Sequence, residues 1–273
     1  MSLFGGFNGY DSGLTGPQQI DFLSNGTWCC PAGIVCAKVY VIVAGGGGGG
    51  GAARCLSGPT PRVTAGGGGG GGGGVSVSTL SAACLCSSYC VVIGAGGLCG
   101  PRAAVNGDQG LPGGTGGDSC FGPLIAGGGG AGAGGCFAVT SSCVVVQGGA
   151  AGSGTTHIGQ TGGCGRIQNG TGIGPTSPTA ANGGRGGGGG CGTADYETGP
   201  AGGGSQIFLD GIRLGCGAEG QFNPVTPDPL GCPAANSYGA GGGGGGSTFY
   251  SGAQCPSTGG PGTKGFVRVI SYF

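Results

Sequence analysis

The sequence predicts a mainly β and irregular fold, in which short β-strands combine with packed polyglycine-II helices and α-helix is essentially absent. Glycine supplies 82 of the 273 residues, against an average of about 7% in proteins. Charged and aromatic residues each make up only 7%, so large apolar side chains are too few for a conventional core. No window has helical periodicity, because glycine and proline interrupt every candidate. Backbone hydrogen bonds must therefore make much of the structure.

The strand predictions rest on short β-branched and aromatic stretches bounded by glycine. A hairpin is predicted around Asp210-Gly211, the dipeptide with the strongest hairpin signal in the chain. A second turn is predicted at Ser141-Ser142. In chain order, the predicted strands are 38–43, 75–80, 89–93, 136–139, 143–146, 206–209, 212–214 and 266–273.

Two long glycine runs, 45–51 and 66–74, predict a different regular structure. Pure glycine forms poor α-helices and poor strands. The remaining option is an extended helix with three residues per turn and no internal hydrogen bonds, in which seven residues span roughly 22 Å and nine span roughly 28 Å. Its N–H and C=O groups need partners on neighbouring helices. We therefore expect rods that pack as a hexagonal bundle or a layered sandwich.

One further stretch shows a three-residue period directly, because Gly107, Gly110, Gly113 and Gly116 are evenly spaced. This spacing fits the inward edge of another rod, with Asp108, Leu111 and Thr115 on its other faces. Chance phasing in so glycine-rich a chain is the alternative.

Composition also narrows the function classes. The nine basic and nine acidic residues cancel, so the basic face typical of nucleic-acid binding is not expected, and Arg185 within a glycine run is only a weak signal for RNA. We expect no signal peptide and no membrane insertion, since the longest apolar stretch, 39–44, is too short to cross a bilayer. The chain divides into an N-terminal attachment arm, 1–26, and a glycine-rich polyglycine-II/β domain, 27–273.

Residues with reactive side chains do not form a known catalytic or metal pattern. The sixteen cysteines include no Cys-x-x-Cys, and the closest group, Cys84, Cys86 and Cys90, would lie on one strand face. These thiols either bury as small apolar groups or form disulfides. His157, the single histidine, is expected in a loop or on the surface. We expect no enzyme activity, no catalytic residues, no cofactor and no metal.

The glycines after strand 38–43 superficially match a dinucleotide-binding fingerprint. That motif requires a helix straight after the glycines, whose N-terminus would receive the pyrophosphate. Here Pro59, Pro61 and further glycines follow. The sequence therefore argues against this site.

Several blocks in order resemble the glycine-rich domains of bacteriophage tail-fibre and related virion-surface proteins. The resemblance begins with Trp28 between small residues, a Pro31-Ala32-Gly33 turn, the Val-rich strand and the glycine run. It continues through blocks 75–77, 91–97, 116–128 and 262–270 and so covers about residues 25–273. The chain departs from the family pattern at Cys29, Cys30, Cys36, Cys84, Cys86 and Cys90, where threonine, serine or valine would be expected.

The resemblance implies a structural virion protein, a phage tail-fibre or tail-tip component assembled in the host cytoplasm and exposed on the particle. Other fibre, tail or capsid proteins would bind through the N-terminal arm, and oligomers are compatible with this role. Polar segments could contact a host surface receptor or merely connect rods: 52–65, 98–112, 153–182 and 217–238. The alternatives are a decoration protein without receptor binding, or a polyglycine-II ice-binding protein, which would need regular rows of threonine or alanine.

Overall fold

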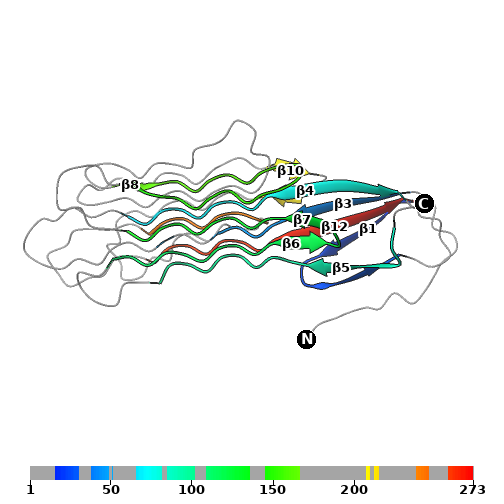
Figure 1. Cartoon of the computed structure of the whole chain (residues 1–273), viewed down its shortest axis with the longest axis horizontal. Helices are drawn as coiled ribbons and strands as arrows, with labels where there is room; N and C mark the ends of the chain where they lie inside the picture. The colour runs from blue at the N-terminus through cyan, green and yellow to red at the C-terminus, as the bar shows by residue number, and fades with distance from the viewer. Residues whose placement is uncertain are drawn as a thin grey trace, which may run out of the picture.

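The computed structural model describes residues 16–30, 38–48, 51, 66–81, 85–101, 109–135, 145–166, 207–209, 212–214, 238–245 and 258–272. These residues form strands and extended segments and contain no α-helix, which confirms the predicted fold class. No helix within these ranges is long and apolar enough to cross a membrane. The strands of the two large sheets gather at one end of an elongated molecule, and the extended segments run away from them (Figure 1).

The first sheet has four antiparallel strands in the order β1 (Gln18–Phe22), β12 (Phe266–Tyr272), β3 (Lys38–Ala44) and β4 (Val75–Ser81). The last three confirm the strands predicted at 266–273, 38–43 and 75–80. Their β-branched residues suit a pleated surface with both faces covered. Alternation along β3 puts Val39, Val41 and Val43 on one face, where all three are fully buried.

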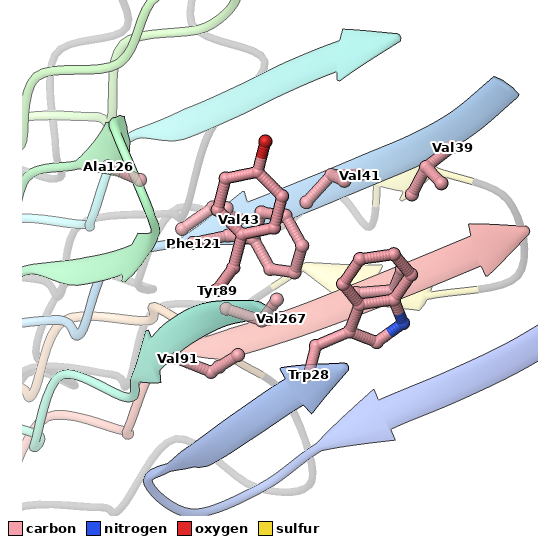
Figure 2. Packing of buried hydrophobic residues seen from close by; sticks show 10 residues of the cluster. Trp28, Val39, Val41, Val43, Tyr89, Val91, Phe121, Ala126 and Val267 are labelled. Carbon is pink, nitrogen blue, oxygen red and sulfur yellow. The ribbon is translucent and has the colours of Figure 1, made fainter. Parts of the chain in front are cut away.

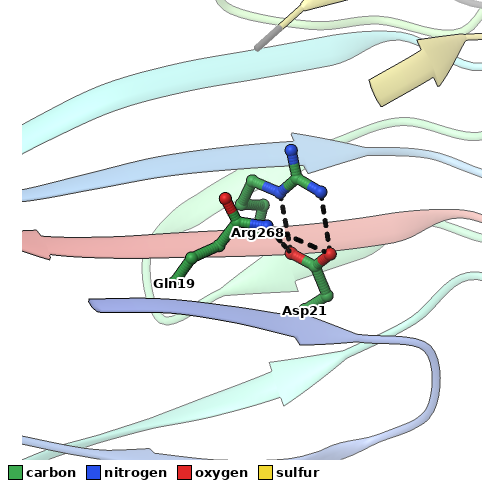
Figure 3. A network of polar contacts seen from close by, with 3 residues as sticks. All are labelled: Gln19, Asp21 and Arg268. Carbon is green, nitrogen blue, oxygen red and sulfur yellow. Dashed lines mark hydrogen bonds and ion pairs between the residues drawn. The ribbon is translucent and has the colours of Figure 1, made fainter. Parts of the chain in front are cut away.

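Strand β1 lies within the predicted attachment arm and was not predicted. It forms an edge of the first sheet, where Asp21 lies opposite Arg268. The Arg268 guanidinium donates two hydrogen bonds of 2.7 Å to the Asp21 carboxylate, beside Gln19 (Figure 3). This two-pronged geometry favours arginine over lysine. Residues 1–15 lie outside the described part, and the attachment role of 1–26 stays a prediction.

The second sheet has the strand order β2 (Gly26–Cys29), β5 (Ser88–Val92), β6 (Ser119–Phe121) and β7 (Leu124–Ala126). β5 confirms the strand predicted at 89–93, while β2, β6 and β7 were not predicted. A two-residue turn, Gly122-Pro123, joins β6 to β7. Gly122 has φ of +55°, and proline fixes the next φ near −65°, which is the combination of a type II′ hairpin turn.

The hydrophobic core lies between these two sheets (Figure 2). Trp28, Tyr89 and Phe121 from the second sheet form an aromatic group, with ring centroids separated by 4.8 to 6.1 Å. The valines of β3 and Val267 and Val269 of β12 face this group. A few large side chains thus suffice for a small sandwich, which we call the sandwich below.

Two short strand pairs complete the described strands. β10 (Ile207–Leu209) pairs with β11 (Ile212–Leu214), which confirms the hairpin predicted around Asp210-Gly211. β8 (Val145–Val146) pairs with β9 (Gly165–Arg166) at the end of the molecule away from the sandwich. The predicted strand 136–139 and the Ser141-Ser142 turn lie outside the described residues.

Candidate functional site: a hexagonal array of polyglycine rods

Nine extended glycine-rich segments among the described residues carry no strand assignment over most of their length and lie side by side. We call them rods. Rods 1 and 2 are the predicted runs 45–51 and 66–74, although residues 49 and 50 are outside the described part. In chain order, the others are rod 3 (94–100), rod 4 (109–117), rod 5 (127–135), rod 6 (147–154), rod 7 (159–165), rod 8 (239–245) and rod 9 (258–265).

Hydrogen bonds between neighbouring rods repeat every third residue. From rod 1 to rod 2, the N–H groups of Gly45, Gly48 and Gly51 donate to the carbonyl oxygens of Gly74, Gly71 and Gly68, with N···O distances of 3.0, 2.8 and 2.9 Å. A strand would repeat this pattern every second residue. A three-residue repeat is that of the polyproline-II type helix. The bonds confirm the structure predicted for both glycine runs.

Rod 1 is bonded to six other rods. Its N–H groups donate to rods 2, 4 and 9, through Gly45, Gly46 and Gly47 respectively. Its carbonyl oxygens accept from rods 5, 3 and 8, at Gly46, Gly47 and Gly48 respectively. These six rods are also bonded to one another in a closed ring, in the order 2, 5, 4, 3, 9, 8 and back to 2. Six neighbours around one member define hexagonal packing, the first of the two arrangements expected from the sequence.

The register of the rods continues the register of the strands. Lys38 of β3 faces Ser81 of β4, Ala44 faces Val75, and the next pair along is Gly45 with Gly74. Likewise the β6–β7 pairing of Ser119 with Ala126 is followed by the bond from Gly116 to Gly129. Each such antiparallel strand pair therefore continues as a pair of rods with the same pairing register. The sandwich consequently sets the alignment of the rods that extend from it.

Side chains are excluded from the centre of the array by close approach of backbones. A Cβ added to Gly45, Gly46, Gly47, Gly48 or Gly51 would lie less than 3.0 Å from a backbone carbonyl oxygen of another rod. The obstructing oxygens belong to Gly127, Ala95, Ala240, Gly130 and Ala133. Since all of these are backbone atoms, no side chain can move aside. Every described position of rod 1 therefore requires glycine for steric reasons.

Every third residue of a rod points in the same direction, and we call each such set of residues a phase. Outer rods tolerate side chains at the phase that faces solvent. In rod 4, Gly110, Gly113 and Gly116 donate to rod 5, and Gly114 and Gly117 donate to rod 3. The remaining phase contains Pro112 and Thr115, which are exposed. In rod 9, Pro261 likewise lies at the phase that donates to neither rod 3 nor rod 8. Proline has no N–H to donate, so both prolines lie where the array needs no donor.

Rod 4 confirms the predicted three-residue phase, because Gly110, Gly113 and Gly116 all bond to the same neighbour while Leu111 and Thr115 are exposed. Gly107 and Asp108 lie outside the described residues.

Side-chain oxygens stabilise the junction between sandwich and rods, a role that the sequence did not reveal. The fully buried hydroxyls of Ser76 and Ser119 accept hydrogen bonds of 2.9 Å from the N–H groups of Thr155 and Gly94 respectively. Thr263 accepts one of 2.7 Å from Ala240. Backbone donors that change from a two-residue to a three-residue repeat would otherwise lose partners. A small polar residue where a strand meets a glycine run is the signal that could have found them.

One predicted connector is wrong in part. Residues 153–182 were expected to form a loop, but 159–165 form rod 7, whose Gly159 and Gly162 donate to Gly152 and Gly149 of rod 6. The stretch 98–112 similarly contains the end of rod 3 and the start of rod 4. Rods 3 and 7 were not predicted because residues other than glycine occupy two of their three phases, whereas rod 4 was predicted from its glycine spacing. Residues 52–65 lie outside the described part, as does 217–238 except for Tyr238.

The described residues with reactive side chains that the sequence singled out are His157 and several cysteines. His157 is in the turn between rods 6 and 7, where its N–H and C=O both bond to Val75. Cys86 and Cys90 are exposed free thiols, so neither of the alternatives given for this group, burial or a disulfide, applies to these two, and Cys84 lies outside the described residues. The other described thiols, also free, are Cys29, Cys30, Cys99, Cys120 and Cys164.

The described part of the chain holds no group of three or more His, Cys, Asp or Glu residues that could bind a metal ion. After β3 the chain continues as rod 1, so the described residues there offer no helix N-terminus for a pyrophosphate.

Four chain connections begin and end at the distal end, which is the end of the array away from the sandwich. Rods 1 and 2 are joined there through 52–65, rods 3 and 4 through 102–108, rod 5 and β8 through 136–144, and rods 8 and 9 through 246–257. At the opposite pole, Gln18 of β1 pairs with Ser271 at the end of β12 away from rod 9. The array thus separates two poles of the molecule.

We expect Gly46→Ala to destabilise the protein by about 1–3 kcal/mol, the usual range for overpacking, because its Cβ would meet the Ala95 carbonyl. Urea unfolding followed by the fluorescence of Trp28, the single tryptophan, measures the change. Gly16→Ala is the control, since nothing lies within 4 Å of an added Cβ there. Equal stability of the two variants would contradict the steric account.

Proline should distinguish the residue phases of rod 4. Gly116→Pro removes the N–H that donates to Gly129 and adds a Cβ that would meet the Gly46 carbonyl. It should cost at least about 1–3 kcal/mol, because a carbonyl partner is left unsatisfied and the rods are forced apart. Thr115→Pro, at the phase that already holds Pro112, should change the unfolding free energy by less than about 0.5 kcal/mol. A comparable loss in both variants would show that the phases are not distinct.

A family model described as a glycine-rich domain matches residues 22–272, nearly the whole chain. A search of curated proteins finds no match. The matched range includes all nine rods and every strand of the two large sheets except β1 (Gln18–Phe22), of which it contains only Phe22. The chain belongs to the glycine-rich domain family.

Proposed function

We propose that this protein is a structural component of a virus particle, a phage tail-fibre or tail-tip protein that presents exposed segments for attachment to the host. The observation that carries the proposal is the separation of the two poles by the rod array. Four chain connections begin and end at the distal pole, and one more, from Arg166, begins there. The ordered sequence blocks that resemble tail-fibre domains give the proposal its biological setting.

The array suits a part that must hold its shape outside a cell. Each described residue of rod 1 is buried and has backbone bonds to other rods. The register is set by strands of the sandwich, so loops at the distal pole can vary in sequence without a change in the array. In this role the protein acts by binding and not by catalysis.

The sandwich pole suits attachment to the rest of the particle. Residues 1–15 precede β1, whose first residue, Gln18, lies at the far edge of the sandwich from the rods. An arm at 1–26 that binds a fibre, tail or capsid protein would therefore leave the distal pole facing outward. The same polarity is compatible with a decoration protein, which would lack receptor binding.

Ice binding gains no support from the outer rods. The exposed phase of rod 4 contains Pro112 and Thr115, and that of rod 6 contains Gln147, Ala150 and Ser153. These rows mix residue types, whereas a flat ice-binding face needs regular threonine or alanine rows.

Adsorption of the purified full-length protein to cells that support the virus tests the proposal. We expect saturable binding. A Gly-Ser linker of equal length should weaken this binding about tenfold or more when it replaces at least one of the distal segments, which are 52–65, 102–108, 136–144 and 246–257. Leu23→Ser, at an exposed site on the sandwich, is the control. Unfolding free energies should not change in the linker variants that lose binding.

Absence of saturable binding would overturn the attachment role and favour decoration. Failure of antibodies against the protein to label intact particles would overturn the virion assignment itself.

A further inference from the structure

Two outer rods carry backbone groups that no described neighbour uses. In rod 5, no hydrogen bond among the described residues reaches the carbonyl oxygens of Gly128, Ala131 and Gly134. In rod 6, the N–H groups of Gln147, Ala150 and Ser153 likewise donate to no described residue. The three rod-6 residues are exposed and the three rod-5 residues are partly exposed. Each rod thus presents one row of groups, spaced by three residues, that pair with no described residue.

The geometry of rod 1 indicates where these two rows point. Around rod 1, the N–H of Gly45 faces rod 2, the carbonyl of Gly46 faces the next neighbour, rod 5, and the N–H of Gly46 faces the one after, rod 4. Round a rod in this direction, the N–H of one residue is therefore followed by the carbonyl of the next residue. That carbonyl is followed in turn by the N–H of its own residue.

In rod 5, the N–H of Gly130 faces rod 6. The carbonyl of Ala131 therefore faces the next position round rod 5, on the side away from rod 2. In rod 6, the carbonyl of Ala150 faces rod 5, so the N–H of Ala150 faces that same position. Two adjacent rods in a hexagonal array share two neighbouring positions. Rod 2 fills one of those shared by rods 5 and 6. No described rod fills the other, which we call the open rod position.

An equivalent position elsewhere in the array is filled by a glycine rod. Rod 7 lies between rods 2 and 6, where it accepts from the N–H groups of Gly69 and Gly72 and donates to the carbonyls of Gly149 and Gly152. One rod supplies the donor row and the other supplies the acceptor row, as at the open rod position. Another polyglycine-II rod could therefore form hydrogen bonds with both exposed rows.

Rod 7 also indicates which sequences fit. A Cβ on Gly159, Gly162 or Gly165 would meet the carbonyl oxygens of rod 2 at Gly72, Gly69 and Gly66. The intervening residues include Gln160, Thr161 and Cys164, so side chains are accepted at the other two phases. A chain segment that fills such a position accordingly needs glycine only at every third residue.

We propose that the open rod position between rods 5 and 6 is a binding site for an extended segment of another protein chain that has glycine at every third residue. Binding adds a rod to the array through a ladder of backbone hydrogen bonds, as an added strand extends an exposed sheet edge. The phase of rod 5 that borders the position contains Gly127 and Gly130, which leave room for a backbone, and Ala133, whose methyl group limits how closely a backbone can approach at the distal end. The site does not depend on the proposed virion function.

A labelled peptide tests the site on the full-length protein by fluorescence anisotropy. The probe is the rod 7 sequence with serine in place of its cysteine, Gly-Gln-Thr-Gly-Gly-Ser-Gly, flanked by lysines for solubility. The control peptide, Ala-Gln-Thr-Ala-Gly-Ser-Ala, differs by one methyl group at each glycine of the critical phase. We expect saturable binding of the probe and at least about tenfold weaker binding of the control.

A matched pair of protein variants locates the binding. Ala133 is partly exposed at the phase that borders the position, so Ala133→Leu should weaken probe binding about tenfold or more. Ala95→Leu makes the same change at an exposed residue of rod 3 and should leave binding unchanged. No saturable binding of the probe, or equal binding of probe and control peptides, would overturn the proposal. Equal effects of the two variants would overturn the assigned position.

Discussion

The backbone hydrogen bond between rods is the interaction on which this structure depends. One such bond adds only about 0.5–1.5 kcal/mol net, but a buried donor or acceptor left without a partner costs about 1–3 kcal/mol. Rod 1 is buried throughout its described length, so it requires rods on all sides. Close approach in every lateral direction is possible only without side chains. Glycine, which loses more conformational freedom on folding than any other residue, is therefore the residue that the central rods need.

The sandwich and the array depend on each other through register. A strand can bond laterally to two neighbours, whereas rod 1 bonds to six. Trp28, Tyr89, Phe121 and the buried valines align the strands by packing, and the pairing of Ala44 with Val75 then continues as Gly45 with Gly74. Contacts such as that of rods 1 and 8, which continue no strand pair, follow once the rods lie parallel. A small core of ordinary composition thus directs a larger region that is built mainly of glycine.

The sequence was most informative where one residue type dominated. The two unbroken glycine runs and the β-branched strands were predicted correctly, as was rod 4 from its spacing of three. Rods 3, 5, 6, 7, 8 and 9 were not identified, because outer rods accept alanine, threonine, glutamine, cysteine or proline at the phases that face solvent. Glycine at every third residue, as at Gly94, Gly97 and Gly100 or at Gly159, Gly162 and Gly165, is the signal that would have found them. Strands of three residues, such as β6 and β7, are too short for alternation to be recognised.

Amide hydrogen exchange in the native protein, resolved residue by residue by NMR, tests the central claim most directly. The account predicts strong protection at consecutive glycines Gly45, Gly46, Gly47 and Gly48, since each donates to another rod. In rod 4 it predicts protection of Gly113, Gly114, Gly116 and Gly117 with fast exchange at Thr115, whose N–H faces solvent. Exchange of Gly45–48 at the rate of an unstructured chain, or uniform exchange along rod 4, would contradict the hydrogen-bonded rod array.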